Sequence, residues 1–321
     1  MKIQAGIIGC GMIAEEHLRA LERLEGLTVS AFCDVDRGRA RGLLDRYGGA
    51  YATDDTERIF TDDAIDAVYI CTHHDSHMPL AVRACAAGKH IMMEKPLALT
   101  IDHCLAIADA VERSGVTMMT AFKLRYYPMV SRARAFITSP LISIAQVMDR
   151  RWPDGFWAQD PVKGGGGVLS QGVHAMDMLC WLNRSEPLRI YAEGGAFTHE
   201  GGPVADTAVA TILFRNGRVA SFAQSDAGET PCLSKFSFQM ADGTRSVHLR
   251  DRLKTGVFFD GQATETISDE EELGMMEENR EFIRALAEGI PPASTVHDGV
   301  RATRMVLKAF EAMKTGIPQE M

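Results

Sequence analysis

The sequence predicts an α/β protein in which a doubly wound parallel sheet is followed by an α+β part with a large, mostly antiparallel open sheet. Three observations support this prediction. Short apolar strands alternate with helices as far as Phe122, a glycine-rich turn follows the first strand, and strands joined by tight turns dominate the second half. We therefore expect two domains, at residues 1–122 and 123–321.

Composition limits the classes of partner and the location. A chain of 321 residues has room for about two domains. The net charge of -9 disfavours nucleic acid and anionic membranes as partners. The N-terminus leads directly into a strand pattern without signal-peptide architecture, and no apolar run approaches the ~18 residues of a membrane span. Seven cysteines without a CxxC pair favour reduced thiols, so we expect a cytoplasmic protein.

The first strand, Lys2–Ile8, ends in a GxGxxA motif that opens a helix, Ala14–Leu21. Gly9 permits the tight turn, and Gly11 lets the backbone approach a pyrophosphate. The phosphates would bind at the helix N-terminus, where backbone amides are unpaired and the helix dipole is positive. The residues predicted to contact this part of a dinucleotide are Gly9, Gly11, Met12 and Ile13.

The second strand, Thr28–Cys33, ends at Asp34, which is 25 residues after Gly9. This spacing is close to the ~20 residues expected for the acid that binds the adenosine ribose. A carboxylate there repels a 2′-phosphate, which favours NAD over NADP. An arginine can hold a 2′-phosphate, so Arg37, with Arg39 and Arg41 behind it, leaves NADP open. At least two of these three arginines are better explained as exposed residues of a solvated helix face than as phosphate ligands.

A third strand, Asp66–Cys71, runs into a polar turn that contains three histidines. We do not predict a metal site there, because no cluster of acids or cysteines completes a coordination sphere. We expect polar groups of this turn to face the cofactor and a helix to begin at its end. The candidate cofactor-binding residues of the turn are Thr72, His73 and His77.

A further strand ends in the tripeptide Glu94-Lys95-Pro96. Proline restricts the preceding residue to extended conformations, so Lys95 lies at a strand end. A helix, Ile101–Arg113, and a strand, Val116–Phe122, continue the alternation. Right-handed crossovers bring the carboxyl ends of such strands to one edge, where open α/β sheets bind their ligands. We therefore assign Glu94 and Lys95 to the cofactor side, in preference to a solvated ion pair.

The second half has a different pattern. A helix at Met129–Thr138 precedes a series of strands, and helices near Glu277–Glu288 and Asp298–Thr315 close the chain. The expected strands are Ile142–Arg151, Leu188–Phe197, Ala208–Phe214, Arg218–Ser225, Ser234–Met240, Ser246–Leu249 and Gly256–Phe259.

A glycine run at residues 164–167 precedes a helix that carries His174 and Asp177. Glycines leave the backbone free to approach a ligand. His174 and Asp177 are three residues apart, so they share one helix face. We expect this polar face to line a cleft and the apolar remainder of the helix to face the core.

These motifs, in this order, resemble the Gfo/Idh/MocA family of oxidoreductases, named for glucose–fructose oxidoreductase and inositol dehydrogenase. The resemblance covers nearly the whole chain. It rests on Gly9-x-Gly11-x-x-Ala14, Ala87-Gly88-Lys89-His90 with Glu94-Lys95-Pro96, Phe122-Lys123-Leu124-Arg125-Tyr126 and the glycine run with Gly172-Val173-His174-Ala175-Met176-Asp177.

The resemblance implies an N-terminal Rossmann domain and a C-terminal substrate-binding and oligomerisation domain, whose open sheet often forms the interface of a homodimer or homotetramer. It also implies hydride transfer between NAD or NADP and a secondary alcohol or ketone carbon of a sugar, cyclitol or sugar derivative. Family members often have Thr-Pro-Asn where this chain has Thr72-His73-His74. Inositol dehydrogenase-like members have an aspartate where this chain has Ser170, which carries no charge to hold His174.

The chemistry needs a base for the hydroxyl proton, while the cofactor accepts the hydride. Lys95 and His174 are the candidate catalytic residues. We favour His174 as proton acceptor and Lys95 as the group that polarises the substrate oxygen, and the exchanged roles stay open. The candidate substrate-side residues are Lys123, Arg125, Tyr126, Trp152, Trp157 and Asp177. The alternative function is a non-catalytic NAD(P)-binding regulator of the same architecture.

Overall fold

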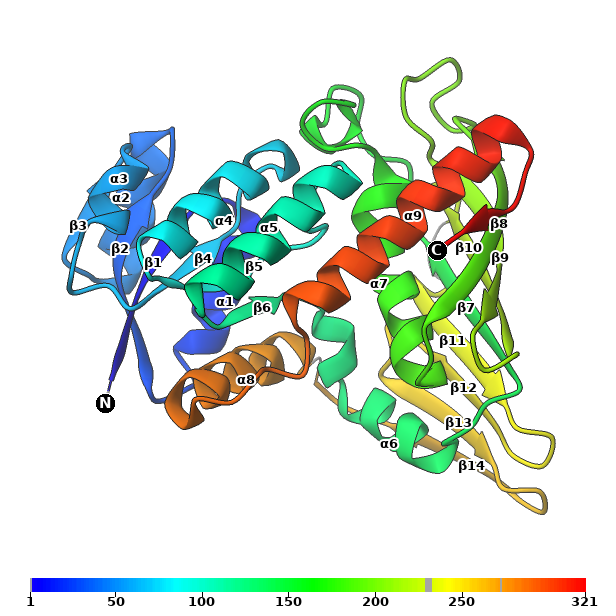
Figure 1. Ribbon diagram of the computed structural model, residues 1–321. Coiled ribbons are helices and arrows are strands. Elements are labelled where there is room, and N and C mark those ends of the chain that lie inside the picture. The colour runs from blue at the N-terminus through cyan, green and yellow to red at the C-terminus, as the bar shows by residue number, and fades with distance from the viewer. Residues whose placement is uncertain (1, 229–232, 272) are drawn as a thin grey trace. The chain divides into compact units, whose positions relative to one another are not determined.

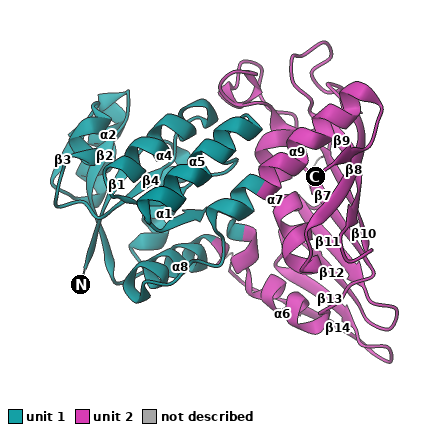
Figure 2. Cartoon of the chain, viewed as in Figure 1, with its two compact units in different colours: residues 1–123, 275–300 teal, residues 124–274, 301–321 magenta. Residues whose placement is uncertain are grey.

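The structure, a computed structural model, describes residues 2–228, 233–271 and 273–321 (Figure 1). The chain forms two compact units (Figure 2). The first contains residues 1–123 and 275–300, and the second contains residues 124–274 and 301–321. The sequence predicted one domain boundary, after residue 122. It did not predict that residues 275–300 belong to the first unit. They return because helix α8 (Gly274–Glu288) contributes Asn279 and Phe282 to a buried cluster there.

The first unit is built on a six-stranded sheet with the order β3-β2-β1-β4-β5-β6, in which every strand pair is parallel. This confirms the predicted doubly wound sheet. The strand order reverses between β1 and β4, and such sheets bind ligands at this point. The strands are β1 (Ile3–Ile8), β2 (Leu27–Cys33), β3 (Tyr51–Thr53), β4 (Ala67–Ile70), β5 (His90–Met93) and β6 (Met118–Thr120).

Helices connect these strands and cover the sheet. Helices α4 and α5 lie side by side in front of it in Figure 1. Because helices cover the strands, the strands are apolar without alternation, and all four residues of β4 are buried. The helices are α1 (Met12–Leu21), α2 (Arg37–Tyr47), α3 (Thr56–Phe60), α4 (His77–Ala86) and α5 (Ile101–Ser114), with a short 3₁₀ turn, η1 (His74–Ser76), before α4.

The second unit contains a nine-stranded sheet with the order β14-β13-β12-β11-β7-β10-β9-β8-β15. Among the described strands of this sheet, only β7 and β10 pair in parallel, which confirms the mostly antiparallel prediction. The strands are β7 (Ile142–Met148), β8 (Pro187–Gly195), β9 (Thr207–Phe214), β10 (Val219–Ser225), β11 (Phe236–Ala241), β12 (Ser246–Arg250), β13 (Thr255–Phe259), β14 (Thr264–Ser268) and β15 (Gln319–Glu320).

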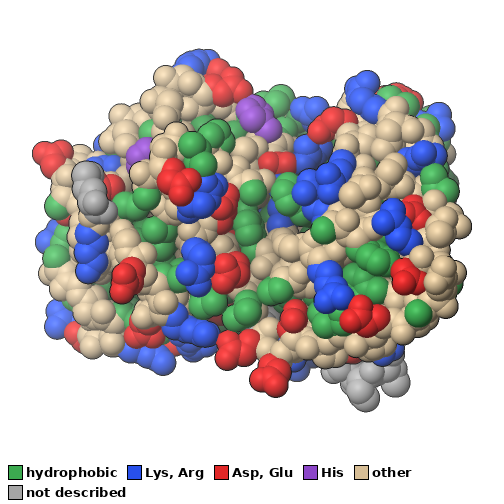
Figure 3. Space-filling view, turned by 90° about the horizontal axis from the view of Figure 1, so that it is seen from below, with side chains coloured by type: hydrophobic (Ala, Val, Ile, Leu, Met, Phe, Trp, Pro, Cys, Tyr) green, Lys and Arg blue, Asp and Glu red, His purple; other side chains and the backbone are tan. Residues whose placement is uncertain are grey.

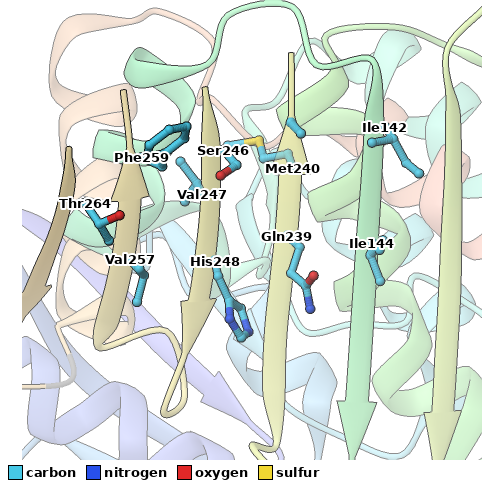
Figure 4. Close-up of a pocket in the computed structure, with 11 residues that line it drawn as sticks. Ile142, Ile144, Gln239, Met240, Ser246, Val247, His248, Val257, Phe259 and Thr264 are labelled. Atoms are coloured by element: carbon cyan, nitrogen blue, oxygen red, sulfur yellow. The ribbon is translucent and has the colours of Figure 1, made fainter. Parts of the chain in front are cut away.

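The two faces of this sheet differ. Helices α6 (Pro128–Phe136) and α7 (Gly167–Asn183) pack on one face, and burial alternates along β7 accordingly. On the other face, Ile142, Ile144, Val257 and Phe259 help to line a hollow of about 360 Å³ (Figure 4). The remaining elements are the 3₁₀ turns η2 (Lys123–Tyr126) and η3 (Trp157–Gln159) and helix α9 (Val296–Thr315).

Two expectations from composition can be compared with the described residues. None of the described helices is both long and apolar enough to cross a bilayer. Six cysteines are described, and all of them are buried free thiols. The seventh, Cys232, lies outside the described residues.

Candidate functional site

The turn between β1 and α1 requires glycine at one position and leaves open space at another. Gly9 has a φ of +91°, and a Cβ there would lie 2.6 Å from the backbone of Cys71. A Cβ at Gly11 would meet nothing within 4 Å. No side chain caps the N-terminus of α1, and Met12 beside it is 78% exposed. Open space next to uncapped helix amides fits a pyrophosphate group.

Asp34 is held beside this turn. Its Oδ2 accepts a hydrogen bond from the Cys10 amide at 2.7 Å, and its Oδ1 accepts one from the Asp36 amide at 2.8 Å. These bonds fix a carboxylate at the carboxyl end of β2, next to the glycine turn. The placement fits a residue that binds the ribose of a dinucleotide.

The three arginines after Asp34 lie near carboxylates of their own. Arg37 Nε is 3.5 Å from Asp54 Oδ1, and Arg39 Nε is 3.6 Å from Asp36 Oδ2. Both side chains are well exposed, so these are weak surface pairs. Arg37 and Arg39 belong to the first turn of α2, close in sequence to Asp34. The neighbouring acids reduce the positive charge available for a 2′-phosphate.

The turn after β4 is tied to the tripeptide 94–96 by His77. Its Nδ1 is 2.9 Å from the carbonyl oxygen of Pro96, and its Nε2 is 3.3 Å from that of Thr72. Burial lowers the pKa of His77, and hydrogen bonds to these carbonyls partly oppose this shift. The cofactor contact predicted for His77 stays a prediction. Its side chain is fully buried and faces backbone carbonyls, so it supports the turn from behind.

Thr72 and His73 lie at the carboxyl end of β4, as predicted. Ser76 Oγ donates hydrogen bonds to Thr72 Oγ1 at 2.6 Å and to the His73 carbonyl at 2.8 Å. His73 is exposed and Thr72 is half-buried. A Cβ at Gly9 would lie 2.9 Å from the Thr72 side chain, so this turn adjoins the glycine turn. Among the residues described, no group of three His, Cys, Asp or Glu side chains is placed to hold a metal ion.

Glu94 is buried and anchors the segment that carries Lys95. Its Oε2 accepts a hydrogen bond from the Lys95 amide at 3.1 Å, and its Oε1 lies 3.2 Å from His17 Nε2. His17 in turn lies on α1, and its Nδ1 is 3.0 Å from Asn279 Nδ2. His17 thus links Glu94 to Asn279.

Glu94 is ionised in this environment. Burial raises its pKa, but the hydrogen bond and charge of His17 act in the opposite direction, as do the charges of two lysines, Lys95 and Lys123. The net result is a pKa below the ordinary value for glutamate. Both carboxylate oxygens already bind groups of the first unit, so Glu94 orients Lys95 from inside the protein. The cofactor contact predicted for Glu94 stays a prediction.

Lys123 follows β6 and belongs to the first unit. Its Nζ is 3.5 Å from Glu16 Oε2 on α1, and its charge contributes to the lowered pKa of Glu94. The substrate-side role predicted for Lys123 stays a prediction, now with a defined position near α1.

The second unit places His174 on α7 as predicted, but it buries almost the whole helix. His174 is 3% exposed, and its ring lies edge-on to Phe236 with centroids 6.0 Å apart. Asp177 is 1% exposed and forms a two-pronged ion pair with Arg125, whose Nε donates to Oδ2 at 2.7 Å. The expectation of a polar helix face open to a cleft is thus corrected for Asp177. Its carboxylate pairs with Arg125, because a buried charge needs a partner.

Arg125 also stacks over the ring of Trp181, 4.5 Å from its centroid. Arg125 and Asp177, both predicted on the substrate side, are brought together and fasten η2 to α7. Trp152 lies edge-on to Phe156 at 5.2 Å, and Phe156 contacts Trp157 at 5.7 Å. The two tryptophans therefore take part in loop packing, and their substrate roles stay predictions.

Sequence reasoning missed the residues behind Lys95. His17 lies in the second turn of α1, and Asn279 is separated from it by 262 residues. A histidine on an otherwise ordinary amphipathic helix gives little signal, and the partnership with Asn279 depends on the return of α8 to the first unit.

The comparisons with known proteins agree with this architecture. A family model described as an oxidoreductase family with an NAD-binding Rossmann fold matches residues 3–122. A second model, for the GFO/IDH/MocA C-terminal domain, matches residues 140–244.

Several known proteins are similar to the chain. The D-xylose 1-dehydrogenase (NADP(+)) 2 of Haloferax volcanii is 27% identical over 98% of this chain and 99% of its own length. The inositol 2-dehydrogenase of Salmonella typhimurium is 36% identical over 40% of this chain and 38% of its own. The structure of levoglucosan dehydrogenase in complex with NADH and levoglucosan shares the fold, with a TM-score of 0.93 at 21% identity over 100% of this chain and 99% of that one.

The two family models match the NAD-binding part and the C-terminal part in the order in which the sequence motifs occur. The first unit thus carries an NAD-binding Rossmann domain, and its glycine turn and Asp34 fit that cofactor. The chain belongs to the Gfo/Idh/MocA family of NAD(P)-dependent oxidoreductases.

Proposed function

We propose that the protein is a dehydrogenase or reductase that transfers a hydride between NAD and a secondary alcohol or ketone carbon of a sugar, cyclitol or sugar derivative. The observation that carries the proposal is the position of Lys95. It follows the β5 strand of the NAD-binding sheet and is fixed there by the buried, ionised Glu94. Relatives named D-xylose 1-dehydrogenase and inositol 2-dehydrogenase support the class of substrate.

In this proposal the nicotinamide of bound NAD accepts or delivers the hydride. Lys95 holds and polarises the substrate oxygen, and His174 accepts the hydroxyl proton during oxidation. The negative charge of Glu94 next to Lys95 suits a lysine that stays cationic, which favours His174 as the base. The exchanged assignment predicts instead that Lys95 takes the proton.

We infer a preference for NAD over NADP from the surroundings of Asp34. Its carboxylate is fixed by two backbone amides and would repel a 2′-phosphate. Arg37 and Arg39, which could attract that phosphate, each lie near an acid.

We also propose that the protein is a homo-oligomer that pairs through the open face of the nine-stranded sheet. This face carries exposed apolar side chains, among them Ile142 at 46% and Val209 at 54%. Its hollow is lined from β7, β11, β12 and β13 (Figure 4). Apolar patches on a sheet of this kind favour a protein partner. By contrast, the surface in Figure 3 shows basic and acidic side chains interspersed.

Calorimetric titration with NADH and with NADPH, followed by a turnover screen of polyols and sugars, tests the function. We expect NADH to bind at least about tenfold more tightly than NADPH, which corresponds to ~1.4 kcal/mol. We then expect turnover with NAD on at least one member of a panel that includes myo-inositol and D-xylose. NADH binding without any turnover would favour the regulator, and absence of binding of both nucleotides would contradict the proposal.

A further inference from the structure

Three aspartates gather at one end of the sheet in the second unit. Asp149 follows β7, Asp226 follows β10 and Asp206 precedes β9. The Asp226 amide donates to the Asp206 carbonyl at 3.1 Å, and the Asp149 amide donates to the Ser225 carbonyl at 2.9 Å. The three residues are therefore neighbours across adjacent strands.

Two of these carboxylates have evident structural partners. Asp206 accepts hydrogen bonds from the amides of Phe197 and His199, each at 2.9 Å. Asp149 forms an ion pair with Lys235 at 2.7 Å. These contacts explain why both acids are tolerated near the sheet end.

Asp226 differs from both. It is 2% exposed, and within the part of the chain that the structure describes its buried Oδ1 has no hydrogen-bond partner. A buried carboxyl oxygen without a hydrogen-bond partner is costly, so its presence requires an explanation.

The backbone is shaped to make room for this carboxyl group. A Cβ at Gly167, the first residue of α7, would lie 2.8 Å from Asp226 Oδ2. No side chain caps the N-terminus of α7, so amide donors and the positive helix end lie near Asp226. His174 follows Gly167 by seven residues, which is about two turns and places it on the same helix face. Asp226 thus lies over the helix face that carries the candidate base.

Charges around Asp226 come from several elements. Burial, together with the negative charges of Asp149 and Asp206, raises its pKa to about 7. His199 and Lys235 act in the opposite direction. Near neutral pH the group is present in both forms, and its protonated form can donate as well as accept a hydrogen bond. A hydroxyl group can likewise both donate and accept a hydrogen bond.

We propose that Asp226 is a substrate-binding residue whose carboxyl group hydrogen-bonds a hydroxyl group of a polyhydroxy substrate at the start of α7. The proposal rests on the proposed function, because that function supplies the polyol. It adds a contact that neither the sequence motifs nor the family resemblance identified.

The test is calorimetric titration of the NADH complex with each polyol of the panel, using wild type, Asp226→Ala and Asp226→Asn. We expect Asp226→Ala to weaken polyol binding by at least about tenfold, because one hydrogen-bonding partner is lost. Asp226→Asn keeps a donor and an acceptor and should stay within about threefold of wild type at pH 6. NADH affinity should be unchanged in both variants. Asp251→Asn, an exposed aspartate of the same unit, is the matched control.

The pH dependence distinguishes a substrate contact from a structural role. Wild-type polyol affinity should rise between pH 6 and pH 8 as Asp226 ionises, because a carboxylate accepts stronger hydrogen bonds. This rise should be absent in Asp226→Asn. A folded Asp226→Ala or Asp226→Asn protein with wild-type polyol affinity at every pH would overturn the proposal. Wild-type protein that binds NADH but no polyol would instead reject the proposed substrate class, and this inference with it.

Discussion

At the scale of single residues, Lys95 owes its position to a buried carboxylate. Glu94 binds the Lys95 amide and His17 at once, so the end of β5 is held from two sides. The lysine side chain is half-buried, whereas Glu94 is 7% exposed. The residue proposed for chemistry is therefore supported by one that is ionised and enclosed.

Replacing either candidate catalytic residue should reduce turnover sharply. We expect Lys95→Ala and His174→Ala each to lower kcat by about two orders of magnitude or more, because general acid–base groups contribute roughly 10²–10⁴. Steady-state kinetics on the best panel substrate measures this, with the exposed Lys163→Ala as control. Near wild-type turnover in both variants would show that the site is elsewhere.

Asp226 also makes a prediction about stability that is independent of substrate. Its folded pKa of about 7 lies above its ordinary value of 3.8. The folded state then holds a proton that the unfolded state has lost, so this residue destabilises the fold progressively as pH rises from about 4 to about 7. Asp226→Asn removes the titration.

Thermal melts at pH 5 and pH 8 measure the effect. The Tm of Asp226→Asn relative to wild type should be higher at pH 8 than at pH 5, by roughly 3–6 °C. Asp251→Asn should show no such change between the two pH values. A constant difference for Asp226→Asn would mean that Asp226 is ionised throughout this range.

At the scale of elements, the β1–α1 turn contains two glycines with different expected roles, one in folding and one in cofactor binding. Gly9 is required by the fold, since a Cβ would strike the Cys71 backbone and the φ is positive. Gly11 faces open space, so a methyl group there should disturb only a bound ligand.

The two glycines should therefore respond differently to alanine. Gly9→Ala should lower Tm by about 4 °C or more and weaken NADH binding. Gly11→Ala should keep Tm within about 1 °C and still weaken NADH binding by roughly tenfold or more, because the added methyl group occupies the space of the pyrophosphate. Gly42→Ala, on the exposed side of α2, serves as control. Wild-type NADH affinity in Gly11→Ala would contradict the predicted phosphate site.

At the scale of the whole molecule, the open sheet face sets the expected assembly. Ile142→Glu puts a charge at the rim of the hollow on β7. If copies pair through this face, the variant should become monomeric at concentrations where wild type is a dimer or tetramer, because burying an unpaired charge is costly. Light scattering coupled to size-exclusion chromatography gives the mass. Ile290→Glu, an exposed isoleucine of the first unit, should leave the mass unchanged.

The sequence alone predicted the fold class and the alternation of parallel strands with helices. It also predicted an NAD-binding domain that begins with the glycine turn. These depend on local information: strand and helix periods, the glycine spacing and the acid that ends β2. It also led to the proposal of Lys95 and His174 as catalytic residues, because each belongs to a motif of neighbouring residues, and these roles stay predictions.

Only the tertiary structure decided how the supporting side chains are used. It pairs Arg125 with Asp177, turns His77 toward two backbone carbonyls and joins His17 to Asn279 across 262 residues. It also encloses Asp226, which no motif marks. The physical reason is that a buried polar group needs a hydrogen-bond or ion-pair partner. The identity of this partner depends on how segments far apart in the chain pack together.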